Sequence, residues 1–212
     1  YWADGPSSEQ PPGHWNLFAQ FVAQQKHYDL DTNVKLFFIL TNALFDAGIA
    51  AWDAKLYYNS ARPITAINYL FNKKPIKAWA GPYKGTRLIQ GQNWLPYQAA
   101  TLVTPAFPEH VSGHSIFSAS GAAVLKRFTG SDSFGFSHTV KAKTSFIEPG
   151  LVPAQDITIS YPTFSGAADE AGISRRYGGI HFEHGDLAGR AMGHLVAQHV
   201  WNKALAYIHG IG

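Results

Sequence analysis

The chain has 212 residues, which is enough for one well-packed domain, and its formal net charge is only +3. Because no run of Lys and Arg accompanies that charge, the composition excludes an evident nucleic-acid-binding surface. Cys is absent, so disulfides are excluded, and the most apolar stretch, residues 34–52, is interrupted by Lys35, Asn42 and Asp46, which predicts a buried helix and no membrane span.

Taken in chain order, the sequence predicts helices separated by irregular segments. Residues 1–14 are rich in Pro, Ser and Gly and should be irregular, and residues 73–111 carry enough Pro and Gly to predict a long loop. Asn16 is a candidate cap for the first helix. Apolar positions at three- and four-residue steps and local capping signals predict helices over residues 16–27, 31–60, 63–71, 112–128, 165–177 and 186–208.

Other local signals refine these elements. Ser112 is expected to open the fourth helix, with Gly130 at its exit. Residues 156–161 alternate between apolar and polar side chains and predict a short strand or an extended loop. Gly189 and Gly193 are expected to let the last helix pack closely against a neighbour.

Together these elements predict an all-α fold, a helical bundle with long loops over its functional site, and one domain covering residues 1–212. The chain begins at Tyr1 without an initiator Met, so we expect a processed or partial chain that lacks helices preceding Tyr1. The sequence does not identify the compartment, although we favour a secreted or periplasmic one.

The first chemical cluster is Lys55 and Arg62, which lie two helical turns apart and nearly on one face. Trp52 lies one turn before Lys55 on the same side. A lone pair of this kind is usually a solvated basic face. Here the surroundings are apolar and Pro63 restrains Arg62, so the two cations should repel each other unless an anion joins them. The pair therefore indicates an anion site.

The second cluster is Ser112, Gly113 and His114, at the start of a predicted helix. If Ser112 is the cap, the free N–H groups of the first turn and the helix dipole favour a negative charge there. Gly113 lets an anion approach the backbone, and His114 offers an imidazole for proton transfer. Taken alone, the tripeptide is more simply an ordinary Ser cap followed by a surface His.

The third cluster is Arg175 and His181. Gly178 and Gly179 can break the helix between them and turn His181 back toward the anion. One imidazole nitrogen could then bond a metal oxyanion or attack phosphorus. The simpler alternative is a loop His near a basic helix end.

Residues around the third cluster have less specific signals. We expect Arg176 to face solvent, and Asp169 or Glu170 either to hold Arg175 in place or to be exposed. The remaining histidines show no His-x3-His pair and no His-Glu-x2-His run, the spacings that would indicate a zinc site.

In this order, the three clusters resemble the vanadium-dependent haloperoxidase and type-2 phosphatidic acid phosphatase superfamily. The match runs from residue 52 to residue 186 through Lys-x6-Arg-Pro, Ser-Gly-His and Ser-Arg-x5-His. Four flanking runs are similar to those of soluble haloperoxidases: residues 52–55, 62–65, 104–109 and 177–182. Phosphatidate phosphatases, by contrast, usually span membranes several times.

The resemblance implies a helical bundle with vanadate as its cofactor. His181 would bond vanadium, and His114 would be the acid–base residue. The resemblance also counts Lys55, together with these two histidines, among the catalytic residues. The residues implied as ligands of the vanadate oxygens are Lys55, Arg62, Ser112, Gly113 through its N–H, and Arg175.

The reaction that the resemblance implies is oxidation of bromide or chloride by hydrogen peroxide to a hypohalous species, which halogenates a small organic substrate. Trp52 and Phe107 fall where chloroperoxidase-type members have Trp and Phe near the halide. Family members often form dimers or larger assemblies, so a homo-oligomer is compatible with the resemblance. The lack of Cys and the single Met agree with exposure to such an oxidant, and equally with chance.

Two positions depart from the family pattern. Val111 replaces the Pro that usually precedes Ser-Gly-His, which should loosen that turn. An acidic residue usually follows the last His by four positions, but Gly185 occupies that position here and Asp186 comes one later. A supporting role for Asp186 is therefore in doubt.

Two other functions stay open on the sequence. A soluble acid phosphatase would use the same site for phosphate, with His181 as nucleophile and His114 as the acid for the leaving group. A non-catalytic structural protein could retain the fold. Vanadate shares the geometry of the phosphoryl transition state, so the site residues do not separate peroxidase from phosphatase, but the flanking runs favour the peroxidase.

Overall fold

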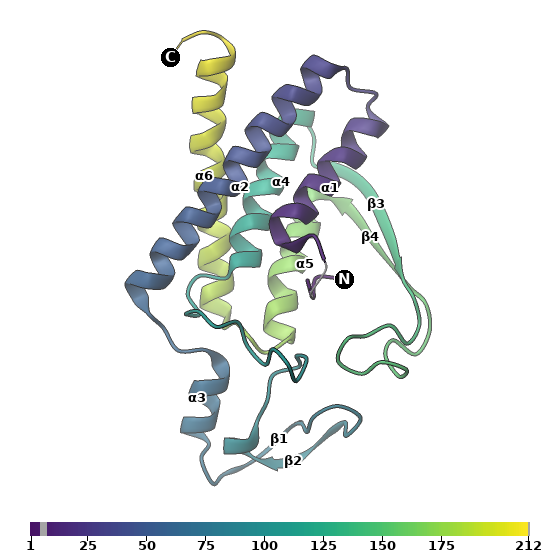
Figure 1. The fold of residues 1–212 in the computed structure, drawn as a ribbon, viewed down its shortest axis with the longest axis vertical. Coiled ribbons are helices and arrows are strands. Elements are labelled where there is room, and N and C mark those ends of the chain that lie inside the picture. Colours follow the sequence, from purple (N-terminus) through teal and green to yellow (C-terminus); the bar gives the residue numbers. More distant parts are fainter. Residues whose placement is uncertain (5–7, 212) are drawn as a thin grey trace.

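The computed structural model describes residues 1–4 and 8–211, and most of it is a bundle of helices (Figure 1). The helix α4 is central to the bundle because it contacts α1, α2, α5 and α6. In chain order the elements are α1 (Gln10–Gln25), α2 (Leu30–Tyr58), α3 (Pro63–Leu70), β1 (Pro75–Trp79), β2 (Thr86–Gln90), the 3-10 helix η1 (Gly91–Asn93), α4 (Gly113–Thr129), β3 (Ser133–Val140), β4 (Ile157–Thr163), α5 (Phe164–Tyr177) and α6 (Glu183–Ile208).

The core is formed by buried apolar side chains of the bundle helices, and Trp15 shows how α1 is joined to α4. Its indole is fully buried, and Nε1 donates to the Ser118 hydroxyl at 2.9 Å. The ring lies so close to Gly121 that a Cβ added there would come within 2.6 Å of it. The hydrogen bond satisfies a donor that would otherwise be buried unpaired, so α1 is held on α4 both by packing and by this hydrogen bond.

Two glycines of α6 bring this helix against the start of α4. A Cβ added at Gly193 would come 2.4 Å from the carbonyl oxygen of Ile116, and one added at Gly189 would come 2.9 Å from that of Ser112. No larger residue fits at this separation without moving a helix. The predicted close packing at Gly189 and Gly193 is confirmed, and it places the beginning of α6 beside the Ser112 cap.

The predicted helices are present with shifted boundaries. The first begins at Gln10 and not after Asn16, because Pro in the first turn suits a helix start. The second begins at Leu30, where the Asp29 side chain accepts from a first-turn N–H at 2.8 Å. Gly130 ends α4 as predicted, with a left-handed φ of 71°.

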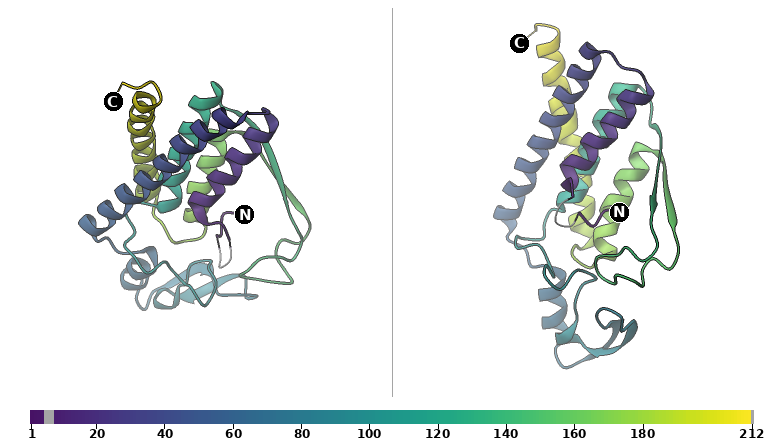
Figure 2. Two further views of the ribbon diagram at one scale, coloured as in Figure 1. Left: turned by 45° about the horizontal axis from the view of Figure 1, so that its top comes forward. Right: turned by 45° about the vertical axis from the view of Figure 1, so that its right-hand side comes forward.

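The fold is not purely α, contrary to the sequence prediction, because it contains two two-stranded antiparallel sheets. Strands β1 and β2 lie within residues 73–111, which were predicted to be a loop, and most of their side chains are exposed, so no alternating apolar pattern marks them. The predicted strand at residues 156–161 is confirmed as part of β4, which pairs with β3 beside α5 (Figure 2).

The long helix α2 keeps an apolar outer face. Residues 30–70 are long and apolar enough to cross a membrane by length and composition, a test that core helices of soluble proteins also pass, and 39% of the most apolar window is buried. The expected absence of a membrane span therefore stays a prediction. Exposed apolar side chains of α2 include Val34, Phe38, Phe45, Ile49 and Leu56.

Candidate active site

The three sequence clusters come together at one end of the bundle (Figure 1). Lys55 lies in the last turn of α2, Arg62 directly before α3, and Arg175 in the last turn of α5, while Ser112 caps α4. Residues 94–112 contain no helix or strand, and they carry the chain past these ends. One site is thus formed by helix ends and a long connecting segment.

All three cations of this site are buried, with 1% of Lys55, 5% of Arg62 and 6% of Arg175 exposed. Burial, and next the charge of Arg62, lower the pKa of Lys55 to about 7. Burial likewise lowers the pKa of Arg62 and of Arg175 to about 10. Cations removed from water to this extent are stabilised by any anion that can reach them, so the electrostatics favour an anionic ligand.

The Lys55 ammonium holds the segment before α4 in place. It donates to the carbonyl oxygens of Pro108 at 2.9 Å, Glu109 at 3.1 Å and Val111 at 2.5 Å. These bonds use its three donors, so in this arrangement Lys55 positions the backbone before Ser112, and contact with a vanadate oxygen stays a prediction. The bond to Val111 also fixes the turn that was expected to be loosened by the absence of Pro.

Arg62 is held on two sides and has one nitrogen left over. Its Nε donates to the carbonyl oxygen of Phe107 at 2.9 Å, and Nη1 donates to that of Ile180 at 2.9 Å and lies 3.0 Å from His181 Nε2. Its buried Nη2 has no hydrogen-bond partner among the described residues. A buried, unpaired guanidinium N–H is the group that an oxyanion would satisfy.

His181 is paired with a carboxylate that the sequence interpretation missed. Its Nδ1 lies 2.8 Å from Glu109 Oε1, which also accepts from the Phe182 N–H at 3.1 Å. Burial alone would raise the pKa of Glu109, but the hydrogen bonds from His181 and from the Phe182 N–H oppose it, and the pKa is lowered. Glu109 is therefore an anion that accepts from His181.

These neighbours fix the tautomer of His181. Burial lowers its pKa to about 4 despite the hydrogen bond to Glu109, so the imidazole is neutral at ordinary pH. Because the anionic Glu109 can only accept, Nδ1 carries the proton, and because Arg62 can only donate, Nε2 presents its lone pair. Nε2 is therefore unprotonated and accepts from Arg62, and a neutral imidazole that exchanges this contact for a ligand can bond a metal centre or attack phosphorus.

Asp186 does not contact His181, in line with the doubt raised from its spacing. Its carboxylate is fully buried, accepts from the Ser115 hydroxyl at 2.8 Å, and is 2.8 Å from Arg190 Nε. It therefore ties α6 to α4. The supporting carboxylate of His181 instead comes from Glu109, within the Phe-Pro-Glu run that precedes Ser-Gly-His.

His114 is paired with a second carboxylate that was also missed, Asp4 in the N-terminal segment. His114 Nε2 lies 2.7 Å from Asp4 Oδ2, and His14 Nδ1 lies 3.0 Å from Asp4 Oδ1. Burial, and next the charge of Arg175, lower the pKa of His114 to about 4. Burial opposes ionisation of Asp4, but its two imidazole partners outweigh it and lower its pKa, so Asp4 is an anion.

The start of α4 leaves room for a ligand. Ser112 is fully buried, its Oγ accepts from the Ser115 N–H at 3.3 Å, and its own N–H donates to the Gly185 carbonyl at 2.9 Å. Among the described residues beyond its chain neighbours and its own helix backbone, a Cβ added at Gly113 would meet only the Phe117 ring, at 3.9 Å. The open space lies at the N-terminal end of a long helix, where the N–H groups and the dipole favour an anion.

Trp52 and Phe107 lie together beside the cations. Their ring centroids are 5.2 Å apart, and the Phe107 centroid lies 5.0 Å from both Lys55 Nζ and Arg62 Cζ. Both aromatic side chains are partly exposed. They form an apolar wall between the buried cations and solvent, and their role toward a halide stays a prediction.

The acidic residues expected near Arg175 have other partners. Asp169 pairs with Arg190, and Glu170 accepts from the Tyr161 hydroxyl at 2.6 Å. The carboxylate whose charge acts on Arg175 is that of Asp4. Neither holds Arg175, because Asp169 pairs toward α6 and Glu170 toward β4. The alternative expectation, that they are exposed, is confirmed for Asp169, whereas Glu170 is half-buried. Arg176 pairs with Glu183 and is partly exposed, as expected for the outward member of the Arg pair.

Comparison with known families identifies the class of protein that this fold and site define. Residues 35–210 match the family described as the VCPO second helical-bundle domain. The match covers most of the chain, which therefore belongs to this family, within the vanadium haloperoxidases. A comparison with curated proteins gave no match.

Solved structures of vanadium enzymes share the fold. A holo-type bacterial vanadium-dependent chloroperoxidase is 26% identical, with a TM-score of 0.79, over 92% of this chain and 42% of that one. The apo-type structure gives the same score and identity over 91% of this chain. A bacterial vanadium-dependent iodoperoxidase is 30% identical, with a TM-score of 0.69, over 95% of this chain and 42% of that one. The chain thus spans well under half the length of these relatives.

The residues that are present fit a vanadate group. Three buried cations supply compensating charge, Arg62 Nη2 has no partner among the described residues, and His181 Nε2 is an unprotonated nitrogen that now accepts from Arg62. The space at Gly113 would accept oxygens beside helix N–H groups. Donors for several oxygens and one nitrogen for the metal are the set that an oxyanion of a metal requires.

Proposed function

We propose that the chain carries the vanadate site of a haloperoxidase, which oxidises bromide or chloride with hydrogen peroxide and halogenates small organic substrates. The observation that carries the proposal is the neutral His181, whose Nε2 lone pair faces the buried cations while Glu109 holds the proton on Nδ1. The family to which the chain belongs supports it. The chain spans 42% of the length of its solved relatives, so haloperoxidase activity is proposed for this chain and does not follow from the family match alone.

Each residue has a distinct task in this proposal. His181 Nε2 would bond vanadium, and Arg62, Arg175, Lys55, Ser112 and the Gly113 N–H would bind the oxygens. Bound vanadate would supply a Lewis-acidic centre at which hydrogen peroxide is activated toward halide. Glu109 keeps His181 in the tautomer with a free Nε2, which is the usual task of a carboxylate behind a metal-binding imidazole.

His114 is assigned the proton transfer. Its Nε2 faces the Asp4 carboxylate, which leaves Nδ1 as the atom that can take up or release a proton. Burial and then the cation Arg175 lower the pKa of His114 to about 4, so its neutral imidazole accepts a proton only weakly. An anion bound nearby is expected to raise that pKa toward the working pH.

A phosphatase with phosphate in the same position is the second candidate. The specific observation in its favour is that neutral His181, with an unprotonated Nε2, is equally a nucleophile for phosphorus. In that case His114 would protonate the leaving group. The non-catalytic alternative would require both buried imidazoles to be retained without a use.

A paired assay on metal-stripped protein, with and without added vanadate, tests these functions. One arm follows peroxide-dependent bromination of a dye, and the other follows hydrolysis of a phosphate ester. We expect bromination that appears only with vanadate. Ester hydrolysis without vanadate, abolished when vanadate is added, would instead assign a phosphatase, and inactivity in both arms would support the structural alternative.

A further inference from the structure

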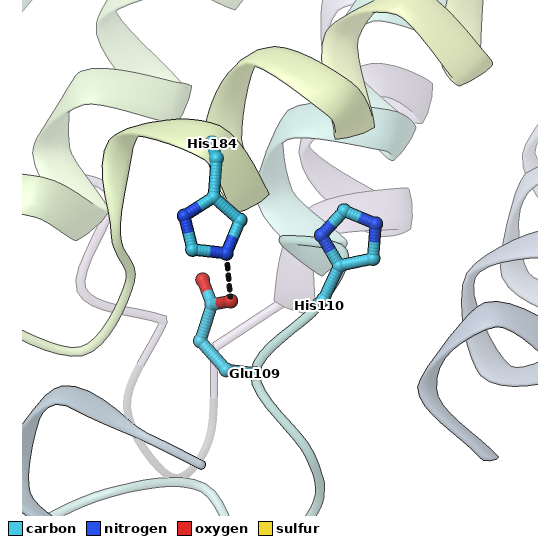
Figure 3. Close-up of side chains that lie close together, drawn as sticks. All are labelled: Glu109, His110 and His184. Atoms are coloured by element: carbon cyan, nitrogen blue, oxygen red, sulfur yellow. Dashed lines mark ion pairs between the residues drawn. The ribbon is translucent and has the colours of Figure 1, made fainter. Parts of the chain in front are cut away.

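We propose that Glu109, His110 and His184 form a second site, which binds a divalent transition-metal ion such as Zn²⁺ beside the oxyanion site. Glu109 and His110 come from the segment before α4, and His184 comes from the first turn of α6 (Figure 3). One ligand atom from each residue can be chosen so that all three lie within 4.8 Å of one another.

Two of these atoms are buried and lack a hydrogen bond. Glu109 is fully buried; its Oε1 binds His181 and Phe182, but Oε2 has no hydrogen-bond partner among the described residues. His184 Nε2 lies 3.5 Å from Oε2. His110 Nδ1 is also buried without a partner in the described part of the chain. An ion bound between them would satisfy both atoms.

Other contacts hold the two imidazole rings near Oε2. The rings of His110 and His184 are stacked, with centroids 5.7 Å apart. The Tyr58 and His110 rings pack edge to face with centroids 4.9 Å apart, and the Phe182 and His184 rings are stacked with centroids 5.6 Å apart. Figure 3 shows both rings and the carboxylate converging on one region. The ligands are thus brought together by contacts that do not themselves need the ion.

The donor set points to the class of metal. Two imidazoles and one carboxylate suit Zn²⁺, Cu²⁺, Ni²⁺ and Co²⁺, whereas Mg²⁺ and Ca²⁺ prefer oxygen ligands alone. Bonds of about 2 Å require the three atoms to draw closer together. His184 can make that movement, because 65% of its side chain is exposed, and the same exposure opens a path from solvent and leaves room for water ligands.

The two sites would share one residue, since Glu109 faces His181 with Oε1 and the proposed ion with Oε2. The alternative use of the same atoms is a simple ion pair between Glu109 and a protonated His184. Only the metal site gives saturable binding of one ion per chain, and only the metal site depends on His110 as well as on His184.

Calorimetric titration of vanadate-free protein with ZnCl₂ in phosphate-free buffer tests the site. We expect one ion per chain, and a loss of affinity of about tenfold or more in His184→Ala and in His110→Phe, since each removes a ligand. Co²⁺ in place of Zn²⁺ should give visible absorption bands that are lost in the same variants.

The matched control is His194→Ala, which removes another exposed imidazole from the same helix. It should bind Zn²⁺ as the unchanged protein does. Absence of saturable binding, or equal affinity in the unchanged protein and in His184→Ala, would overturn the proposal. The titration needs neither vanadate nor turnover, so its failure and a failure of the proposed function are separate results.

Discussion

Two histidines at the same end of the bundle, His181 buried and His114 half-buried, have the same side-chain chemistry and different surroundings. Burial lowers the pKa of both His181 and His114 to about 4, and each faces an anionic carboxylate. For His181 that carboxylate is Glu109, which a backbone N–H also holds. For His114 it is Asp4, which is shared with a second imidazole, that of His14.

The difference shows how one type of pair can serve two tasks. Glu109 and Arg62 determine the protonation of both nitrogens of His181, which suits an atom that must remain a ligand. Within the described part of the chain, His114 contacts a carboxylate through Nε2 and has no partner at Nδ1, which suits a group that must gain and lose a proton. The comparison predicts that the two pairs respond differently to mutation.

The largest effect is expected for His181→Ala. Removing the only nitrogen proposed to bond vanadium should lower vanadate-dependent bromination by roughly 10³-fold or more, as for other central catalytic groups. Turnover at saturating vanadate measures this, with His194→Ala as an unaffected control. Activity close to that of the unchanged protein would contradict both enzymatic proposals.

The second largest effect is a loss of stability in acid. Because the folded-state pKa values of His181 and His114 lie below the free value of 6.5, the unfolded chain binds more protons between those limits. The free energy of unfolding should therefore fall as the pH drops from about 6.5 to about 4, by up to about 3 kcal/mol for each histidine.

Urea unfolding at several pH values measures this slope. The variant His181→Gln cannot titrate, so its stability should depend less steeply on pH over the same range. A slope equal to that of the unchanged protein would mean that His181 already titrates normally in the folded state.

Glu109→Gln should have an intermediate effect. The amide can still hydrogen-bond Nδ1 but removes the charge that fixes the tautomer, so vanadate affinity should fall about 10- to 100-fold. Equilibrium binding of vanadate measures this, and the matched control is Asp186→Asn, another fully buried carboxylate that does not contact His181. Equal losses of affinity in the two variants would show that Glu109 acts only through stability.

Asp4→Asn should have the smallest effect and a different signature. Vanadate affinity should be retained, while kcat falls by about tenfold, because only the proton-transfer residue loses its partner. Asp4 raises the pKa of His114, so its removal should move the acid limb of the pH–rate profile to lower pH. A loss of vanadate affinity without a shift of that limb would contradict the assigned task of His114.

Features that depend on neighbouring residues could be predicted from the sequence. Ser112 caps α4 and Gly130 ends it, because capping bonds and a left-handed backbone involve only a few consecutive positions. The order and spacing of Lys55, Arg62, Arg175 and His181 were sufficient to indicate the family, which the family match confirms.

Hydrogen-bond partners far apart in the chain were decided by the tertiary structure. The sequence put Asp186 in doubt as a carboxylate for His181 and offered no replacement; in the fold Asp186 binds Ser115 of α4, and Glu109 lies against the imidazole. No sequence pattern pointed to Asp4 as a partner of His114, because the sequence of an irregular Pro-rich segment does not indicate where the segment will pack.

Local sequence thus predicted the helices to within shifted boundaries, both ends of α4 and the kinds of residue at the site, but not the start of α1. Only the tertiary structure decided which carboxylate faces which imidazole, and with it the nitrogen that His181 leaves free. The physical reason is that helix periodicity and capping act over a few residues, whereas a buried ion pair depends on how close the packed helices come, which at Gly189 and Gly193 is fixed by the absence of a side chain.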